Sequence, residues 1–204
     1  MNHAAVRNVI FDVGGVLLEW DPEQIVRRFC SDPDLSGLLK RAVFEHDDWH
    51  ALDKGTLEEG RAIQNFRQRT GQSLGEVEAL LQAARESLVP IQPTVDLFEE
   101  LAAQGVPLYC LSNMSSSTFS YLRERYDFWN RFRGIVISAH IRMKKPEPAI
   151  FQHLLSRFAL AAEACVFIDD LPVNVISARE AGLQAILFQG AKDCGNKLKP
   201  LLGI

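Results

Sequence analysis

The sequence predicts an α/β protein built on a parallel β-sheet, and two patterns lead to this class. From residue 92 onward, short apolar segments of strand type alternate with segments of helical periodicity. Strands and helices in that order form parallel sheets through right-handed crossovers. A further strand-like segment, residues 9–11, stands alone near the start of the chain. Because a single strand cannot satisfy its own backbone hydrogen bonds, we expect it to join the same sheet.

A helical lobe is predicted to interrupt the sheet after its first strand. Residues 17–87 hold four segments of helical periodicity and no convincing strand. The predicted division is therefore a sheet domain of residues 1–16 and 88–204 and an inserted lobe of residues 17–87 that covers the strand ends. Its helices are expected to begin at Pro22 behind an Asp21 cap, near Leu35 and running towards Trp49, after Thr56, and at Ser73.

Two of these helix starts have the spacing of a capping box. Ser73 is followed three residues later by Glu76, and Thr56 in the same way by Glu59. In such a box the hydroxyl and the carboxylate each accept a backbone N–H of the first turn.

The remaining elements of the sheet domain alternate in type. The expected strands are residues 106–111, 134–139, 165–168 and 184–188, and the expected helices are residues 93–104, residues 116–125, one opening at Pro146, and one from Pro172 to Gly182.

Composition narrows the possible functions. The 204 residues carry a net charge of −4 and no basic run, so we expect no nucleic-acid partner. No stretch of about 18 apolar residues occurs, and the start at Met1, Asn2 and His3 is not a basic and then apolar leader, so we expect a cytoplasmic protein without a membrane partner. Monomer and homodimer both stay open.

The cysteines do not suggest a disulfide or zinc site. They are widely spaced without a CxxC pair, and Cys110 and Cys165 lie in apolar segments, so we interpret these two as buried thiols. Histidine is also scarce, which leaves an oxygen-liganded cation as the possible metal.

Polar residues gather where the predicted strands end. Asp12 directly follows residues 9–11, and Gly14 and Gly15 behind it allow a sharp bend. The carboxyl ends of parallel strands share one edge of a sheet, where ligands bind, so we expect these residues to converge. The four groups are Asp12, Ser112 with Asn113, Lys144 with Lys145, and Asp169 with Asp170.

These residue types favour phosphoryl transfer to water. Carboxylates without histidine or cysteine suit Mg²⁺, which also commonly binds a substrate phosphate. The neighbours Asp169 and Asp170 would repel each other without a cation between them. With Mg²⁺ and a lysine screening the charge, Asp12 can attack phosphorus in line and form an aspartyl-phosphate that water hydrolyses.

The same residues resemble the four motifs of the haloacid dehalogenase-like superfamily, in order and over nearly the whole chain. Within it, the chain is most similar to the α-D-glucose-1-phosphate phosphatases and the phosphatase-like domain of epoxide hydrolases. The resemblance implies a Rossmann-like core with an inserted helical cap of the C1 type. It also implies an Mg²⁺-dependent phosphatase acting on a small phosphorylated metabolite, possibly a sugar phosphate.

The resemblance further implies a role for each residue. Asp12 is the nucleophile and a metal ligand, Lys145 is the third-motif base, and Ser112 binds the phosphoryl group. Asn113 fixes either the phosphoryl group or the turn. The metal is expected on Asp12, the backbone carbonyl of Gly14, Asp170 and Asp169, and Asn174 is placed as a further polar ligand or supporting group.

Gly14 departs from the family pattern, because most family phosphatases carry a general-acid aspartate there. A water or a cap residue could replace it, the substrate could have a better leaving group, or hydrolysis could be slow. General acid catalysis is typically worth about 10²–10⁴-fold.

Two other functions stay open. A 2-haloacid dehalogenase would use Asp12 without a general acid or a metal, but it would leave Asp169 and Asp170 without a purpose. A phosphoester-binding protein that has lost turnover is the other. Trp20, Trp49 and Phe66 are interpreted as lobe core rather than as substrate contacts.

Overall fold

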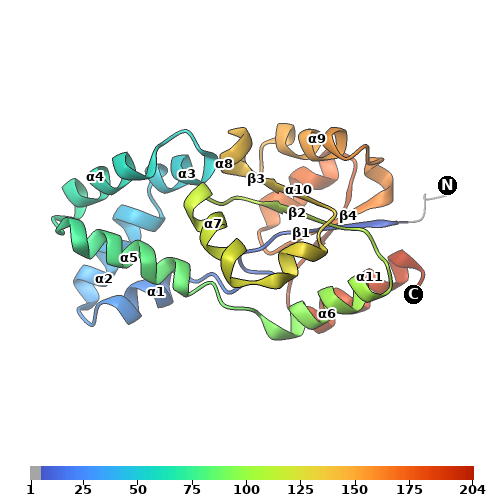
Figure 1. The fold of residues 1–204 in the computed structure, drawn as a ribbon, viewed down its shortest axis with the longest axis horizontal. Coiled ribbons are helices and arrows are strands. Elements are labelled where there is room, and N and C mark those ends of the chain that lie inside the picture. The colour runs from blue at the N-terminus through green and yellow to red at the C-terminus, as the bar shows by residue number, and fades with distance from the viewer. Residues whose placement is uncertain (1–5) are drawn as a thin grey trace.

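The computed structural model describes residues 6–204 and has one five-stranded sheet in the order β3-β2-β1-β4-β5 (Figure 1). Every neighbouring pair of strands is parallel, which confirms the predicted α/β class. Residues 1–5, including the predicted leaderless start, lie outside the described residues. The strands are β1 (Asn8–Phe11), β2 (Leu108–Ser112), β3 (Gly134–Ile137), β4 (Cys165–Asp169) and β5 (Gln184–Leu187).

The first strand lies at the centre of the sheet. Phe11 pairs with Cys110 of β2 on one side and with Ile168 of β4 on the other. The backbone N–H of Asp12 still donates to the carbonyl of Ile168, at 2.9 Å. The chain therefore leaves β1 between the carboxyl ends of its two neighbours, and Asp12 stands at that point.

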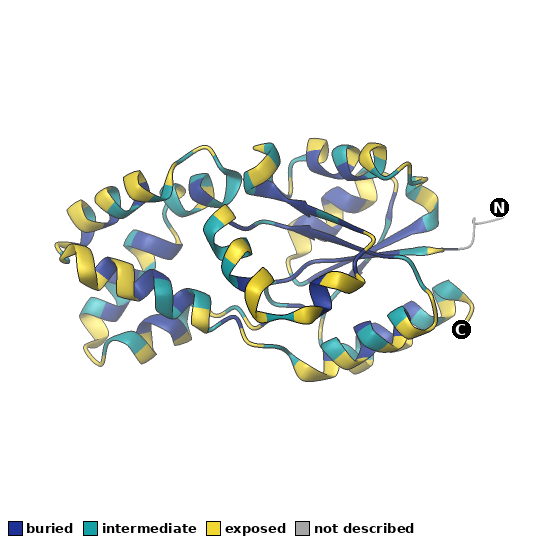
Figure 2. Cartoon of the chain, in the orientation of Figure 1, coloured by how far each residue is buried: buried dark blue, intermediate teal, exposed yellow. Residues whose placement is uncertain are grey.

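Hydrophobic clusters hold helices on both faces of the sheet. Helices α6, α7 and α11 pack with Phe11 and Cys110 on one face, and α9 and α10 pack with Ile10 and Phe167 on the other. Figure 2 shows the strands largely buried and the outer helix faces exposed. Cys110 and Cys165 are buried free thiols, as predicted. The helices are α6 (Gln92–Ala103), α7 (Ser116–Arg125), α9 (Pro148–Arg157), α10 (Pro172–Glu180) and α11 (Ala191–Leu202).

The inserted helices form a lobe with its own hydrophobic cluster, centred on Phe66 and Leu80, beside the sheet (Figure 1). Leu17 and Leu18, which precede these helices, belong instead to the cluster of the sheet. Within residues 6–204, no helix combines the length and apolar composition needed to cross a membrane. The lobe comprises α1 (Pro22–Phe29), α2 (Pro33–Leu39), a π-helical segment (Lys40–Phe44), α3 (Asp47–Lys54), α4 (Glu59–Thr70) and α5 (Leu74–Glu86).

One predicted capping box exists and the other does not. Ser73 Oγ accepts the N–H of Glu76 at 3.3 Å, and the Glu76 carboxylate accepts the N–H of Ser73 at 2.8 Å, which confirms the first box. The box at Thr56 is wrong. The hydroxyl of Thr56 donates to the carbonyl of Ala51 in the preceding helix, and α4 begins at Glu59 without a side-chain cap.

Other element boundaries also differ from the prediction. The helix expected from Leu35 towards Trp49 breaks after the π-helical segment, because His46 Nδ1 accepts the N–H of Asp48 and starts a new helix. Strand β3 stops at Ile137 because α8 (Ser138–Ile141) follows it directly. The chain also contains α11, which the sequence patterns did not indicate.

Candidate active site

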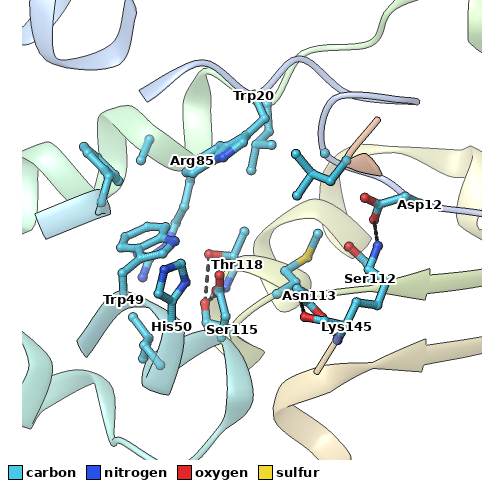
Figure 3. Close-up of a pocket in the computed structure, with 18 of the residues that line it drawn as sticks. Asp12, Trp20, Trp49, His50, Arg85, Ser112, Asn113, Ser115, Thr118 and Lys145 are labelled. Atoms are coloured by element: carbon cyan, nitrogen blue, oxygen red, sulfur yellow. Dashed lines mark hydrogen bonds and ion pairs between the residues drawn. The ribbon is translucent and has the colours of Figure 1, made fainter. Parts of the chain in front are cut away.

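The strand ends bring the predicted residues around one cavity of about 260 Å³ between sheet and lobe (Figure 3). Asp12 follows β1, Ser112 ends β2 and Asp169 ends β4. Asp169 is fully buried and does not line the cavity. The predicted residues that do line it are Asp12, Gly14, Ser112, Asn113, Lys145, Asp170 and Asn174.

Lys145 joins two of the carboxylates. Its ammonium lies 2.8 Å from Asp12 Oδ1 and 2.7 Å from Asp169 Oδ2, and its side chain is 1% exposed. Burial alone would lower the pKa of this ammonium, but the two carboxylates outweigh burial and the pKa is raised. Lys145 is therefore a permanent positive charge beside Asp12.

Two asparagine side chains fix this arrangement. The Asn113 amide accepts the backbone N–H of Lys145 at 2.8 Å and donates to its carbonyl at 2.9 Å. Of the two roles expected for Asn113, fixing the turn is the one these contacts serve. The Asn174 amide donates to both oxygens of Asp169 at 3.0 and 3.1 Å. Asn174 thus supports the carboxylate that holds Lys145.

The protein alone does not provide enough positive charge to neutralise the carboxylates of Asp12 and Asp170. Burial raises the pKa of Asp12 to about 7 although Lys145 opposes the shift. Burial, helped by the nearby Asp169 charge, also raises the pKa of Asp170. Both shifts mean that the ionised carboxylates lack a full counter-charge in the protein, so this pair favours a bound cation.

The donor set fits Mg²⁺. Asp12, Asp169 and Asp170 each offer a carboxylate oxygen, all within 4.8 Å of one another. Oxygen ligands at about 2.0–2.1 Å from one ion lie up to about 4 Å apart, so a cluster of this size can close around one small cation with modest side-chain movement. The oxygens of Asp169 already accept bonds from Lys145, Asn174 and the N–H of Leu171. The oxygens of Asp12 and Asp170 border the cavity and are more available to an ion.

The two glycines that follow Asp12 have different structural reasons for being glycine. Gly15 has a φ of +76°, and a Cβ on it would collide with the carboxylate of Asp170. A Cβ on Gly14 would lie 3.5 Å from Cβ of Trp20, an ordinary contact. Trp20 thus stands where the cavity passes from the acidic cluster to the lobe.

The far wall of the cavity is apolar, which the sequence did not indicate. Phe66 is fully buried in the lobe as predicted, but Trp20 and Trp49 line the cavity. Trp20 precedes the first helix of the lobe, and helical periodicity can mark Trp49 as inward-facing without saying whether the inside is core or cavity. The apolar lining consists of Trp20, Phe44, Trp49, Leu52, Leu81, Ala84, Leu88, Met114 and Leu171.

Residues 6–182 match the family model of the haloacid dehalogenase-like hydrolases. The chain belongs to this family. A sesquiterpene phosphatase from Aspergillus oryzae is 29% identical over 95% of both chains. A D-ribitol-5-phosphate phosphatase from Bacteroides thetaiotaomicron is 21% identical over 97% of this chain and 98% of that protein.

The fold of this haloacid dehalogenase-like hydrolase also matches solved structures. A family enzyme from Bacteroides thetaiotaomicron, in complex with magnesium and inorganic phosphate, superposes with a TM-score of 0.77 at 22% identity, over 95% of this chain and 99% of that one. The family assignment made from the motifs is therefore confirmed. The narrower likeness to glucose-1-phosphate phosphatases stays a prediction.

Proposed function

We propose that this haloacid dehalogenase-like hydrolase is an Mg²⁺-dependent phosphatase that cleaves a small phosphomonoester. The observation that carries the proposal is the contact of the Lys145 ammonium with Asp12, in a cavity that Asp170 also lines. A cationic side chain against a carboxylate, with further carboxylates for a metal, is a site for phosphate rather than for a neutral substrate. The phosphatase relatives described above support this choice.

Mg²⁺ would be held by Asp12, Asp170 and the backbone carbonyl of Gly14. When bound, it neutralises phosphate charge and helps to orient the substrate. Asp169 was predicted as a fourth ligand, and its contacts with Lys145 and Asn174 favour a supporting role.

The protein's own residues then carry out two displacements. In the first, a carboxylate oxygen of Asp12 attacks phosphorus as the bond to the alcohol oxygen breaks, which leaves an aspartyl-phosphate. In the second, water hydrolyses this acyl phosphate and restores Asp12. Lys145 and the hydroxyl of Ser112 stabilise the charge on the phosphoryl oxygens.

The leaving alcohol oxygen must take up a proton. Position 14, where most family phosphatases carry an aspartate that donates this proton, is glycine here. We propose that water supplies this proton. The helical lobe acts as a cap that closes the cavity over the phosphoryl group, since the lining includes residues of α3 and α5.

The alternatives have less support. A dehalogenase would have no use for three carboxylates within 4.8 Å of one another. A binding protein without turnover would not need Lys145 buried against Asp12. The cytoplasmic location, the sugar phosphate and the absence of nucleic-acid and membrane partners stay predictions, and monomer and homodimer stay open.

The test is hydrolysis of p-nitrophenyl phosphate with Mg²⁺ and with EDTA. We expect Mg²⁺-dependent turnover that Asp12→Asn abolishes. The matched control is Asp193→Asn, a partly exposed aspartate on α11 that does not line the cavity, which should leave turnover unchanged. Turnover in EDTA equal to that in Mg²⁺, or turnover by Asp12→Asn, would overturn the proposal, and halide release from a 2-haloacid in EDTA would favour the dehalogenase.

A further inference from the structure

The cavity has two chemically different ends (Figure 3). Asp12, Ser112 and Lys145 lie together at one end, and Trp49 and Arg85 lie across the space from them. Between these ends, the walls contributed by the lobe are mostly aromatic and aliphatic. A phosphomonoester placed with its phosphorus at Asp12 therefore extends its organic group into apolar surroundings.

We propose, on the basis of the phosphatase function above, that the substrate is the monophosphate of a compact apolar alcohol rather than of a sugar. The cavity of about 260 Å³ is small, slightly below the range of about 300–1,000 Å³ for ligand pockets. It thus suits one ring or short branched chain, and not a coenzyme or a polymer.

Three aromatic rings form the core of this wall. The rings of Trp20 and Trp49 stack with centroids 5.7 Å apart, and Phe44 meets Trp49 edge-on at 4.8 Å. Both tryptophans remain partly exposed although they pack on the lobe cluster. A ligand that covers such exposed aromatic faces with apolar groups gains binding free energy, because both apolar surfaces leave water.

The polar groups on this side are partly engaged by the protein. The Arg85 guanidinium forms an ion pair with Glu59 and donates to Ser117 Oγ at 3.2 Å, while its buried Nε has no hydrogen-bond partner among the described residues. The Asp53 carboxyl lies close to the backbone of Ser115 and to the Trp49 side chain, and both oppose the rise of its pKa that burial causes. His50, which also lines the cavity, is exposed.

Most of the wall that the lobe contributes is apolar, so the several hydroxyls of a sugar would find fewer partners here than they have in water. Unsatisfied polar groups are strongly disfavoured when they leave water. The apolar wall also begins next to the phosphate site, because Trp20 packs beside Gly14. A hydrocarbon group attached directly to the ester oxygen would therefore contact the apolar wall.

A matched pair of substrates tests the inference. Cyclohexylmethyl phosphate and glucose 6-phosphate both place a primary phosphate on a six-membered ring, and both release a primary alkoxide, so the missing acid at position 14 affects them alike. With Mg²⁺, we expect kcat/KM for cyclohexylmethyl phosphate to be higher by at least about tenfold. An equal or inverted ratio would overturn the inference.

A variant of the wall shows whether the lobe causes the preference. Trp49→Gln should bring the ratio of the two kcat/KM values towards one, and Trp49→Phe should largely keep it. The control is Leu35→Gln, since Leu35 packs on the lobe cluster but does not line the cavity. The ratio does not depend on how much of the variant is folded. If Trp49→Gln left the ratio intact, the aromatic wall would not be the binding surface.

A binding measurement separates this inference from the phosphatase proposal. In calorimetry with Mg²⁺, cyclohexylmethylphosphonate should bind more tightly than methylphosphonate and with a more negative heat-capacity change. Tighter binding without any turnover would refute the phosphatase and keep the apolar site. Turnover of p-nitrophenyl phosphate with equal binding of the two phosphonates would do the reverse.

Discussion

The side-chain amide of Asn113 holds both the N–H and the carbonyl of Lys145, at 2.8 and 2.9 Å. One residue at the end of β2 therefore fixes the backbone that carries the active-site cation. Because the ammonium of Lys145 also bonds Asp12, Asn113 positions this positive charge next to the proposed nucleophile.

Removing this support should reduce turnover. A misplacement of about 1 Å can lower a rate by about 10²-fold, so we expect Asn113→Ala to lower kcat by about tenfold to a hundredfold. The control is Asn130→Ala, since Asn130 is exposed and does not line the cavity. Initial rates with p-nitrophenyl phosphate check the effect. Unchanged kcat in Asn113→Ala would mean that Lys145 keeps its place without it.

Removing the cation itself should destabilise the fold. Lys145→Met leaves Asp12 and Asp169 buried without their partner, and breaking a buried pair typically costs about 3–5 kcal/mol. We expect a loss of this size in urea unfolding at pH 8 in EDTA. The loss should be smaller at pH 5, because the pKa of Asp12 is about 7 and its protonation removes one of the two unpaired charges. An equal loss at both values would contradict this account.

The bend after the nucleophile gives a test with a matched control. Gly15 and Gly71 have φ values of +76° and +73°, but a Cβ would strike Asp170 at Gly15 and nothing within 4 Å at Gly71. Alanine at either position should cost about 1–2 kcal/mol of backbone strain. Only Gly15→Ala should weaken Mg²⁺ binding, measured by calorimetry, because it displaces Asp170. Equal Mg²⁺ affinity in both variants would remove Asp170 from the ligand set.

Asp53 should make stability depend on pH. Burial raises the pKa of its carboxyl from 3.8 to about 7 in the folded protein. The folded state then binds the proton more tightly than the unfolded state, so this contribution is complete below about pH 4 and is lost as the pH rises through 7. The stability of Asp53→Asn relative to the wild type should thus increase from pH 5 to pH 8. Urea unfolding at both values measures it, and a constant difference would show that Asp53 titrates normally.

The sequence could predict the sheet and the polar half of the site for one physical reason. Strands buried on both faces are short apolar runs, and a polar residue directly after such a run must emerge at the strand end. Asp12, Ser112 and Asp169 all follow this rule. Parallel pairing then brings them together without any knowledge of the lobe.

The apolar half could not be predicted in this way. Periodicity identified Trp49 as inward-facing, but only the packing of α3 and α5 decides whether it meets core or cavity. Asp53 has no sequence signal either, since it lies beside Leu52 in an ordinary helix. Helix α11 was missed because Gly195 and Pro200 interrupt its pattern.

The central claim is that Asp12 carries the phosphoryl group during turnover. The direct measurement is borohydride reduction of the enzyme, quenched during turnover with p-nitrophenyl phosphate and Mg²⁺, followed by mass spectrometry of the peptide that contains residue 12. The account predicts conversion of Asp12 to homoserine only when substrate and Mg²⁺ are both present. Full turnover with Asp12 unmodified, or with the reduction at another carboxylate, would contradict it.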